Sequence, residues 1–277
     1  MHTRANEPMP RFSANLGFLF SERPEIERVA AAAAAGFKAV EMHWPYQVPA
    51  ADMRAALARS QVTMLGLNTP VGNADAGEFG LGALPGREDD FQRSADQAIS
   101  YGAAIGATAV HCMAGVVAAD ASADAERTFV ENLRGAADKA AQASMTILIE
   151  PLNLRDKPGY FLHSVEQAAS IIEKVGRSNV RIMFDCYHLQ IMQGDLITRL
   201  KTHLALIGHV QIAGVPSRAE PDEGELNYPE ICRALDQMGY EGWIGAEYKP
   251  RGRTEEGLGW LSAWSDGLSP NRAGARA

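Results

Sequence analysis

The sequence repeats one unit eight times: a short apolar run followed by a stretch with helical spacing. Most of these runs are continuously apolar, which is typical of strands buried on both faces of a parallel sheet. The units recur about every 33 residues, which is the spacing of an α/β fold of the (β/α)8 TIM-barrel class. The eight expected strands are Phe12–Gly17, Ala39–Trp44, Thr63–Asn68, Ala109–Ala114, Thr146–Leu152, Arg181–Cys186, Ile207–Gly214 and Trp243–Pro250.

Helix signals fill the segments between the runs. Apolar side chains recur at helical spacing over Ile26–Ala35 and Ala125–Ala143. A third helix is expected to begin with a capping box at Ser164–Gln167 and to end at Gly176. The competing architecture is an open doubly wound sheet, but that fold normally has a Gly-rich phosphate turn after the first strand, and Asn15–Phe18 offers none.

The length of 277 residues fits one barrel. We expect a flexible N-terminal segment over residues 1–10, a catalytic barrel over residues 11–264 and a flexible tail over residues 265–277. The long Gly-rich connection Thr69–Gly86 is expected to act as a lid or a binding loop.

The net charge and the cysteines indicate which partners and which cellular compartment to expect. The net charge of −8 disfavours nucleic acid and anionic membranes as partners. The N-terminus lacks the apolar core of a signal peptide, and no apolar run is long enough to span a bilayer. The cysteines Cys112, Cys186 and Cys232 have no metal-site spacing, so we expect them to be buried and free in a cytoplasmic protein.

Polar side chains end four of the later strands: Glu150, Asp185, Gln211 and Glu247. The carboxyl ends of barrel strands form one mouth, so these side chains are expected to meet there. Three buried carboxylates would repel one another unless a cation lies between them. Carboxylate and amide oxygens suit Mg²⁺ or Mn²⁺. The alternative, in which each carboxylate caps a helix or pairs with a basic residue, is less economical for four neighbouring strand ends.

Several segments also carry a family resemblance, in colinear order from about residue 11 to 262: Phe12–Leu16, Leu84–Glu88, Val130–Arg134, Ile149–Asn153, Asp185–His188, Gly208–Ala213, Gly224–Tyr228 and Glu247–Pro250. They resemble the hydroxypyruvate isomerase family of xylose-isomerase-like barrels, which includes 2-oxo-tetronate isomerases. The resemblance implies that Glu150, Asp185, Gln211 and Glu247 bind the metal and that the two glutamates are the catalytic acid/base pair.

The implied reaction interconverts hydroxypyruvate and 2-hydroxy-3-oxopropanoate (tartronate semialdehyde) by proton transfer through an enediolate. The substrate is therefore a small hydroxy-carbonyl acid. Related ketose epimerases carry His at the position of Gln211, so the glutamine favours the isomerase branch. A 2-oxo-tetronate isomerase and a ketose 3-epimerase remain alternatives.

Three further residues are candidates for substrate binding. His188 follows Asp185 closely, and a role at the helix entry is its alternative. Arg218 and Lys249 lie beyond the seventh and eighth strands and are candidates to bind the substrate carboxylate; ordinary surface positions are the alternative. Phe18 and Trp44 are expected to wall the mouth or to pack in the core.

Some features depart from the family pattern. Ala213–Pro216 replaces an Asp-Asn-Pro stretch, and the family pattern does not require His43 and His111. These changes border the pocket and leave the substrate open. Barrels of this type often pair, so a homodimer or a homotetramer is compatible with the sequence.

Two other classes share the barrel. Metal-dependent abasic-site endonucleases resemble the chain at Glu150, Asp185 and His188, but Asn68 and Gln211 stand where their zinc site would need ligands. The net charge also opposes DNA binding. A non-catalytic binding protein would be expected to have damaged ligand positions, and all four are intact.

Overall fold

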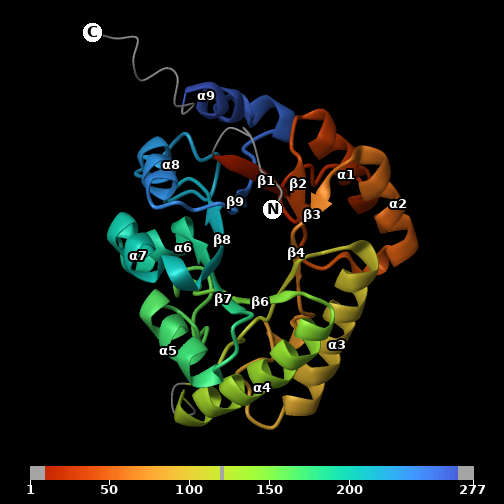
Figure 1. The fold of residues 1–277 in the computed structure, drawn as a ribbon, viewed down its shortest axis with the longest axis vertical. Helices are drawn as coiled ribbons and strands as arrows, with labels where there is room; N and C mark the ends of the chain where they lie inside the picture. The colour runs from red at the N-terminus through yellow and green to blue at the C-terminus, as the bar shows by residue number, and fades with distance from the viewer. Residues whose placement is uncertain (1–9, 119–121, 268–277) are drawn as a thin grey trace, which may run out of the picture.

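The first strand of the chain pairs with the last, and this closes the sheet into a barrel. The computed structural model describes residues 10–118 and 122–267. All neighbouring strands are parallel and follow chain order, so the predicted (β/α)8 barrel is confirmed and the open sheet is excluded. Figure 1 shows the strands at the centre with the helices in a ring around them. The strands are β1 (Arg11–Asn15), β2 (Ala39–Glu41), β3 (Thr63–Met64), β4 (Gly66–Asn68), β5 (Ala109–His111), β6 (Thr146–Ile149), β7 (Val180–Asp185), β8 (Ile207–Ile212) and β9 (Trp243–Ala246).

The third predicted strand is divided in two. β3 pairs with β2, whereas β4 pairs with β5. Backbone hydrogen bonds join the two parts of the barrel, from Met42 N to Gly66 O at 3.0 Å and from Asn68 N to His43 O at 2.8 Å. The interruption therefore changes the continuity of one strand and leaves the barrel topology as predicted.

The helices pack their apolar faces against the outside of the strands and enclose one large core. The predicted helices over Ile26–Ala35 and Ala125–Ala143 exist as α1 and α4, with ends shifted by up to three residues. Two helices, α6 and α7, fill the segment between β7 and β8. The helices are α1 (Glu25–Ala34), α2 (Ala50–Ser60), α3 (Glu88–Ile105), α4 (Ser122–Gln142), α5 (Val165–Val175), α6 (Cys186–Met192), α7 (Leu196–His203), α8 (Tyr228–Gln237) and α9 (Gly259–Gly267).

The predicted capping box of α5 is half formed. The Ser164 side chain accepts a hydrogen bond from Gln167 N at 3.2 Å, as expected for an N-cap. The Gln167 side chain, however, accepts from His163 N at 3.1 Å instead of from the capping residue. At the other end Gly176 adopts a left-handed conformation with φ of 64°, so the predicted stop is confirmed.

Most strands end earlier than the apolar runs suggest, and this places the polar residues. β6 ends at Ile149 and β9 at Ala246, so Glu150 and Glu247 are the first residues beyond the ladder. The apolar runs in the sequence extend beyond the strand ends because buried loop residues at the mouth are also apolar. The early ends free these two residues from the strand geometry at the carboxyl end of the barrel.

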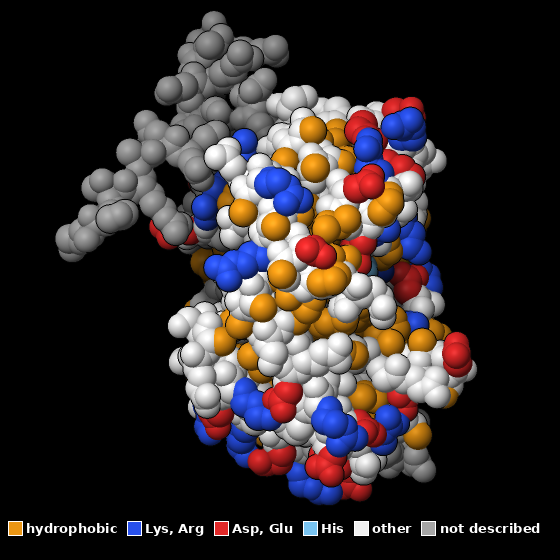
Figure 2. All heavy atoms as spheres, turned by 90° about the vertical axis from the view of Figure 1, so that its right-hand side faces the viewer, with side chains coloured by type: hydrophobic (Ala, Val, Ile, Leu, Met, Phe, Trp, Pro, Cys, Tyr) orange, Lys and Arg blue, Asp and Glu red, His pale blue; other side chains and the backbone are white. Residues whose placement is uncertain are grey.

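The cysteines, the surface charges and the helix lengths agree with the expectations from the sequence. Cys112, Cys186 and Cys232 are buried and free, as predicted. Figure 2 shows the side that carries α2 and α3, where acidic and basic side chains are interspersed. Within the described part of the chain, no helix has the length and apolarity needed to cross a membrane. Helix α9 reaches Gly267; the rest of the predicted tail, and residues 1–9 of the predicted N-terminal segment, lie outside the described residues.

Candidate active site

The four residues expected to bind a metal lie at the mouth of the barrel, on four consecutive strands. Glu150 follows β6, Asp185 ends β7, Gln211 lies in β8 and Glu247 follows β9. Asp185 is paired in register with Gln211, which places the two side by side. All four side chains are buried, with at most 6 % of any residue exposed. Burial of this kind is costly for carboxylates that have no compensating partner.

One oxygen of each of these residues has no hydrogen-bond partner among the described residues. The unpaired atoms are Glu150 Oε1, Asp185 Oδ2, Gln211 Oε1 and Glu247 Oε2, and each is fully buried. Buried polar atoms are nearly always satisfied in folded proteins, so each exception needs an explanation. Four oxygens from one donor set fit a hard divalent cation such as Mg²⁺ or Mn²⁺.

The second polar atom of three of these residues is anchored. Tyr187 N donates to Asp185 Oδ1 at 2.7 Å, so this carboxylate also caps α6. His43 Nε2 lies 2.9 Å from Glu247 Oε1. Gln211 Nε2 donates to a carboxylate oxygen of Glu41 at 2.8 Å. Each side chain is thus held by one atom while a second atom, an oxygen, makes no hydrogen bond, which is an arrangement typical of preorganised ligands.

Glu150 is anchored less directly. His111 Nδ1 lies 3.6 Å from Glu150 Oε2, beyond hydrogen-bond distance. Burial, with a smaller contribution from His43, lowers the pKa of His111 to about 3. His111 is therefore neutral at pH 7 and does not balance the charge of Glu150.

The carboxylates of the site repel one another. Burial and the charges of Glu247 and Asp185 raise the pKa of Glu150 well above its usual value. Burial and the charge of Glu247 likewise raise the pKa of Asp185 to about 7. A divalent cation among these oxygens would reverse both effects, because it favours the charged form of every carboxylate around it.

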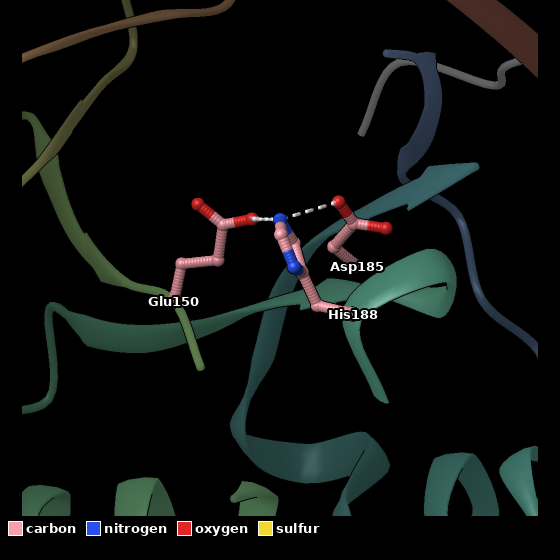
Figure 3. Close-up of side chains that lie close together, drawn as sticks. All are labelled: Glu150, Asp185 and His188. Atoms are coloured by element: carbon pink, nitrogen blue, oxygen red, sulfur yellow. Dashed lines mark ion pairs between the residues drawn. The ribbon is translucent and has the colours of Figure 1, made fainter. Parts of the chain in front are cut away.

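His188 lies next to these carboxylates but is oriented as a hydrogen-bond donor. Ligand atoms of Glu150, Asp185 and His188 all lie within 4.8 Å of one another, and Figure 3 shows the imidazole between the two carboxylates. Asn153 N donates to His188 Nδ1 at 3.1 Å, so this nitrogen carries a lone pair. In a neutral imidazole the proton then lies on Nε2. Burial lowers the pKa of His188 well below its usual value, which keeps the ring neutral.

The Nε2–H of His188 points toward Asp185 Oδ2 at 3.6 Å and Glu150 Oε1 at 3.9 Å. A nitrogen that carries a proton cannot coordinate a cation. In this arrangement the oxygen atoms are the groups that could bind a cation, and His188 Nε2 offers a hydrogen bond, although the imidazole belongs to the same buried group.

A pocket of about 300 Å³ opens above the carboxylates, and it has the size of a small-molecule site. All three candidates for substrate binding line it together with the two glutamates: His188, Arg218 and Lys249. Phe18 and Trp44 form part of its wall, as expected. The structure therefore brings every residue of the expected site to one end of the barrel.

Arg218 is the most constrained of the basic residues. Its side chain is 16 % exposed, and its guanidinium lies 5.0 Å from the ring centres of both Phe18 and Tyr187. One of its terminal nitrogens lies 3.5 Å from Glu247 Oε2 and 3.7 Å from Asp185 Oδ2. Its Nε is buried and has no hydrogen-bond partner within the described ranges. A buried arginine with a free donor suits a ligand carboxylate.

The sequence did not single out Lys157 and Phe79, which also line the pocket. The ammonium of Lys157 lies 3.8 Å from the centre of the Phe79 ring. Phe79 belongs to the Gly-rich connection Thr69–Gly86, which thus contributes to the pocket wall, as expected of a binding loop. Lys157 lies in the long connection after Glu150, and that length was the available signal for it.

Comparisons with known proteins agree with the barrel fold. The model of the xylose isomerase-like TIM barrel family matches residues 29–264. The chain is 49 % identical to a 2-oxo-tetronate isomerase of Cupriavidus necator, over 92 % of this chain and 99 % of that protein. It is 39 % identical to the hydroxypyruvate isomerase of Escherichia coli K12, over 92 % and 100 %. A crystal structure from Brucella melitensis described as AP endonuclease, family 2, superposes with a TM-score of 0.90 at 44 % identity, over 92 % and 99 %.

Proposed function

The chain belongs to the xylose isomerase-like TIM barrel family, and we propose that it is a metal-dependent isomerase of small hydroxy-carbonyl acids. Its first proposed reaction is the interconversion of hydroxypyruvate and 2-hydroxy-3-oxopropanoate. The observation that carries the proposal is the set of four buried oxygens on Glu150, Asp185, Gln211 and Glu247 that have no hydrogen-bond partner among the described residues. Relatives named hydroxypyruvate isomerase and 2-oxo-tetronate isomerase support the same kind of activity.

The proposed cofactor is Mg²⁺ or Mn²⁺, held by those four oxygens. Such an ion would supply Lewis-acid chemistry, polarising the substrate carbonyl and stabilising the negative charge that develops in an enediolate. The remaining chemistry falls to the residues of the chain.

The two glutamates are proposed as the acid/base pair. One carboxylate removes a proton from C3 of hydroxypyruvate, and the other carboxyl group delivers a proton to C2. The hydroxyl proton at O3 passes to O2, so the product is an isomer of the substrate.

The walls of the pocket are proposed to orient the substrate. Arg218 offers an unpaired Nε and a terminal nitrogen to the substrate carboxylate, and Lys249 lies beside it over the same Phe18 ring. We propose that the Nε2–H of His188 donates to a substrate oxygen, which its tautomer and its place in the pocket wall support. Both contacts fix the acid so that its C2 and C3 face the glutamates.

A 2-oxo-tetronate is the second candidate substrate. The pocket of about 300 Å³ has room for a fourth carbon, and Lys157 lies at its wall to meet an added hydroxyl group. Ketose 3-epimerisation is less well supported, because a ketose has no carboxylate to meet Arg218. The free and buried cysteines fit an enzyme of a reducing compartment such as the cytoplasm.

Phosphodiester cleavage is also disfavoured, despite the description of the Brucella structure. The unpaired ligand atoms are oxygens, and Gln211 and Asn68 stand where a multi-zinc site would need nitrogen ligands. The net charge of −8 opposes DNA.

The test is to strip the protein of metal, reload it with Mg²⁺ or Mn²⁺, and follow hydroxypyruvate by NMR. We expect metal-dependent formation of 2-hydroxy-3-oxopropanoate that is lost in Glu150→Gln and Glu247→Gln. Glu173→Gln, an exposed position on α5, is the matched control and should convert substrate normally. Turnover by both active-site variants at near-normal rates would overturn the proposed roles. Metal binding without conversion of hydroxypyruvate would transfer the proposal to 2-oxo-tetronates, which are tested in parallel.

A further inference from the structure

Below the proposed metal ligands, the barrel interior contains a second buried carboxylate group that the reaction does not use. Glu41 ends β2 and is 4 % exposed. One of its oxygens accepts from Ser13 Oγ at 3.1 Å, and the other accepts from Gln211 Nε2 at 2.8 Å. His209 Nε2 lies 3.1 Å from both oxygens. Neither side-chain oxygen of Glu41 is among the buried atoms that lack a hydrogen-bond partner.

Strand β9 leaves space for the side chain of Glu41. Gly245 in β9 pairs in register with Gln211. A Cβ atom at this position would lie 2.2 Å from Glu41 Oε1 and 2.8 Å from His209 Nε2. A side chain at residue 245 would therefore displace Glu41, and the glycine permits its approach to Gln211.

Gln211 is the one proposed ligand whose side chain is symmetric in shape but not in chemistry. Its amide can present either an acceptor oxygen or a donor NH₂ group to the mouth, and only the oxygen binds a cation. A hydrogen bond from the NH₂ to a carboxylate fixes the choice, because the carboxylate accepts and cannot donate. The oxygen is then directed toward the other three ligands, where it is buried and unpaired.

The barrel interior has space into which the Gln211 side chain could move if it lost its hydrogen bond to Glu41. A cavity of about 130 Å³ borders Glu41, His209 and Gln211 on the inner side of the barrel. Without its tether, Gln211 has room to rotate its amide or to turn away from the mouth. Positioning by a neighbour is thus needed at this ligand.

We propose that Glu41 is a positioning residue that holds the amide of Gln211 with its oxygen toward the metal site. Its charge faces His209, whereas its hydrogen bond to Gln211 does the positioning. The inference rests on the proposed metal site. Outer partners of metal ligands typically contribute about 10–100-fold in affinity, which sets the expected scale.

Two conservative variants separate the hydrogen bond from the charge. Glu41→Gln keeps the length of the side chain and an acceptor oxygen for Gln211 but loses the charge. Glu41→Asp keeps the charge but is one methylene shorter, which withdraws the acceptor from Gln211. We expect Glu41→Asp to raise the Kd for Mn²⁺, measured by EPR of the free ion, about 10–100-fold. Glu41→Gln should stay within about threefold of the wild type.

The control and the background variant locate the effect. Ser13→Ala removes a different donor from Glu41 and should leave Mn²⁺ affinity nearly unchanged. In a Gln211→Ala background, Glu41→Asp should have no further effect, because the group that it positions is absent. Circular dichroism and thermal unfolding verify that each variant is folded.

The outcomes distinguish the two proposals. The reverse order, with Glu41→Gln weaker than Glu41→Asp, would show a charge effect and overturn the positioning role. So would an undiminished effect of Glu41→Asp in the Gln211→Ala background, or unfolding of both Glu41 variants. Absence of Mn²⁺ binding by the wild type would overturn the proposed metal site itself.

Discussion

Two neighbouring layers of the barrel interior differ in whether their buried polar atoms are hydrogen-bonded. The mouth layer, formed by Glu150, Asp185, Gln211 and Glu247, has four buried oxygens without a hydrogen-bond partner among the described residues. The lower layer, formed by Ser13, Glu41 and His209, leaves no buried side-chain oxygen or nitrogen unpaired in the described chain. Unpaired atoms are costly to keep and mark where a ligand binds, whereas paired atoms give a fixed support.

The same contrast appears in the pKa values of the carboxyl groups. Burial and the charges of neighbouring carboxylates raise the pKa of Glu150. Glu41 is also buried, which raises its pKa, but the charge and hydrogen bond of His209 and the bonds from Gln211 and Ser13 outweigh burial and lower it. Equal burial therefore gives opposite results, and the partners decide which.

The largest expected difference between the layers is in catalysis. Glu247→Gln should lower kcat/KM about 10³-fold or more, because it removes an acid/base group and a proposed metal ligand together. Ser13→Ala, in the lower layer, should change kcat/KM by less than about threefold. Steady-state kinetics with saturating metal measures both. Comparable losses in the two variants would remove the functional distinction between the layers.

The pH dependence of metal binding should be the next largest effect. The pKa of Asp185 rises from 3.8 to about 7 on folding in the absence of metal, so the folded protein holds a proton that metal must displace. Below pH 7 the affinity for Mn²⁺ should fall about tenfold per pH unit, measured by titration calorimetry. An affinity for Mn²⁺ that does not change between pH 5 and 7 would contradict the displacement of a proton from Asp185.

Removing a carboxylate charge should change the stability of the metal-free protein in opposite directions in the two layers. The raised pKa of Asp185 means that its contribution to stability is present below pH 3.8 and is lost as pH rises through about 7. At pH 8, Asp185→Asn should therefore raise the Tm by relieving repulsion, because asparagine can still cap α6 but carries no charge. Glu41→Gln should lower the free energy of unfolding by about 1–3 kcal/mol, because His209 loses its charged partner. Thermal unfolding in excess chelator measures both, and shifts of the same sign would refute the contrast.

The smallest expected effect concerns the pocket wall above the mouth layer. Arg218→Lys keeps the charge but loses the Nε donor and the stacking between Phe18 and Tyr187. The KM for hydroxypyruvate should rise about tenfold while kcat changes less. An unchanged KM would show that Arg218 does not bind the substrate carboxylate.

The sequence predicted the mouth layer better than the layer below it. A carboxylate after an apolar strand is a strong signal, so Glu150, Asp185 and Glu247 could be found from local pattern alone. The bond between Glu41 and Gln211 joins residues 170 positions apart and depends on the register across β1, β9 and β8. Nothing local to Glu41 indicates that its partner is an amide.

The loops above the mouth were predictable only in part. Arg218 could be suggested as a basic residue beyond β8, but its burial depends on packing between rings from two distant segments. The same applies to the contact of His43 with Glu247, which joins residues 204 positions apart. Such contacts follow from the complete fold and not from spacing.

The most direct test of the central claim is a crystal structure of the Mn²⁺-loaded protein with an anomalous difference map collected at the manganese edge. The account predicts one peak at the mouth, coordinated by an oxygen each from Glu150, Asp185, Gln211 and Glu247, with His188 Nδ1 still bonded to Asn153 and its Nε2 off the metal. Coordination by His188 in place of Gln211, or a peak elsewhere in the barrel, would contradict it.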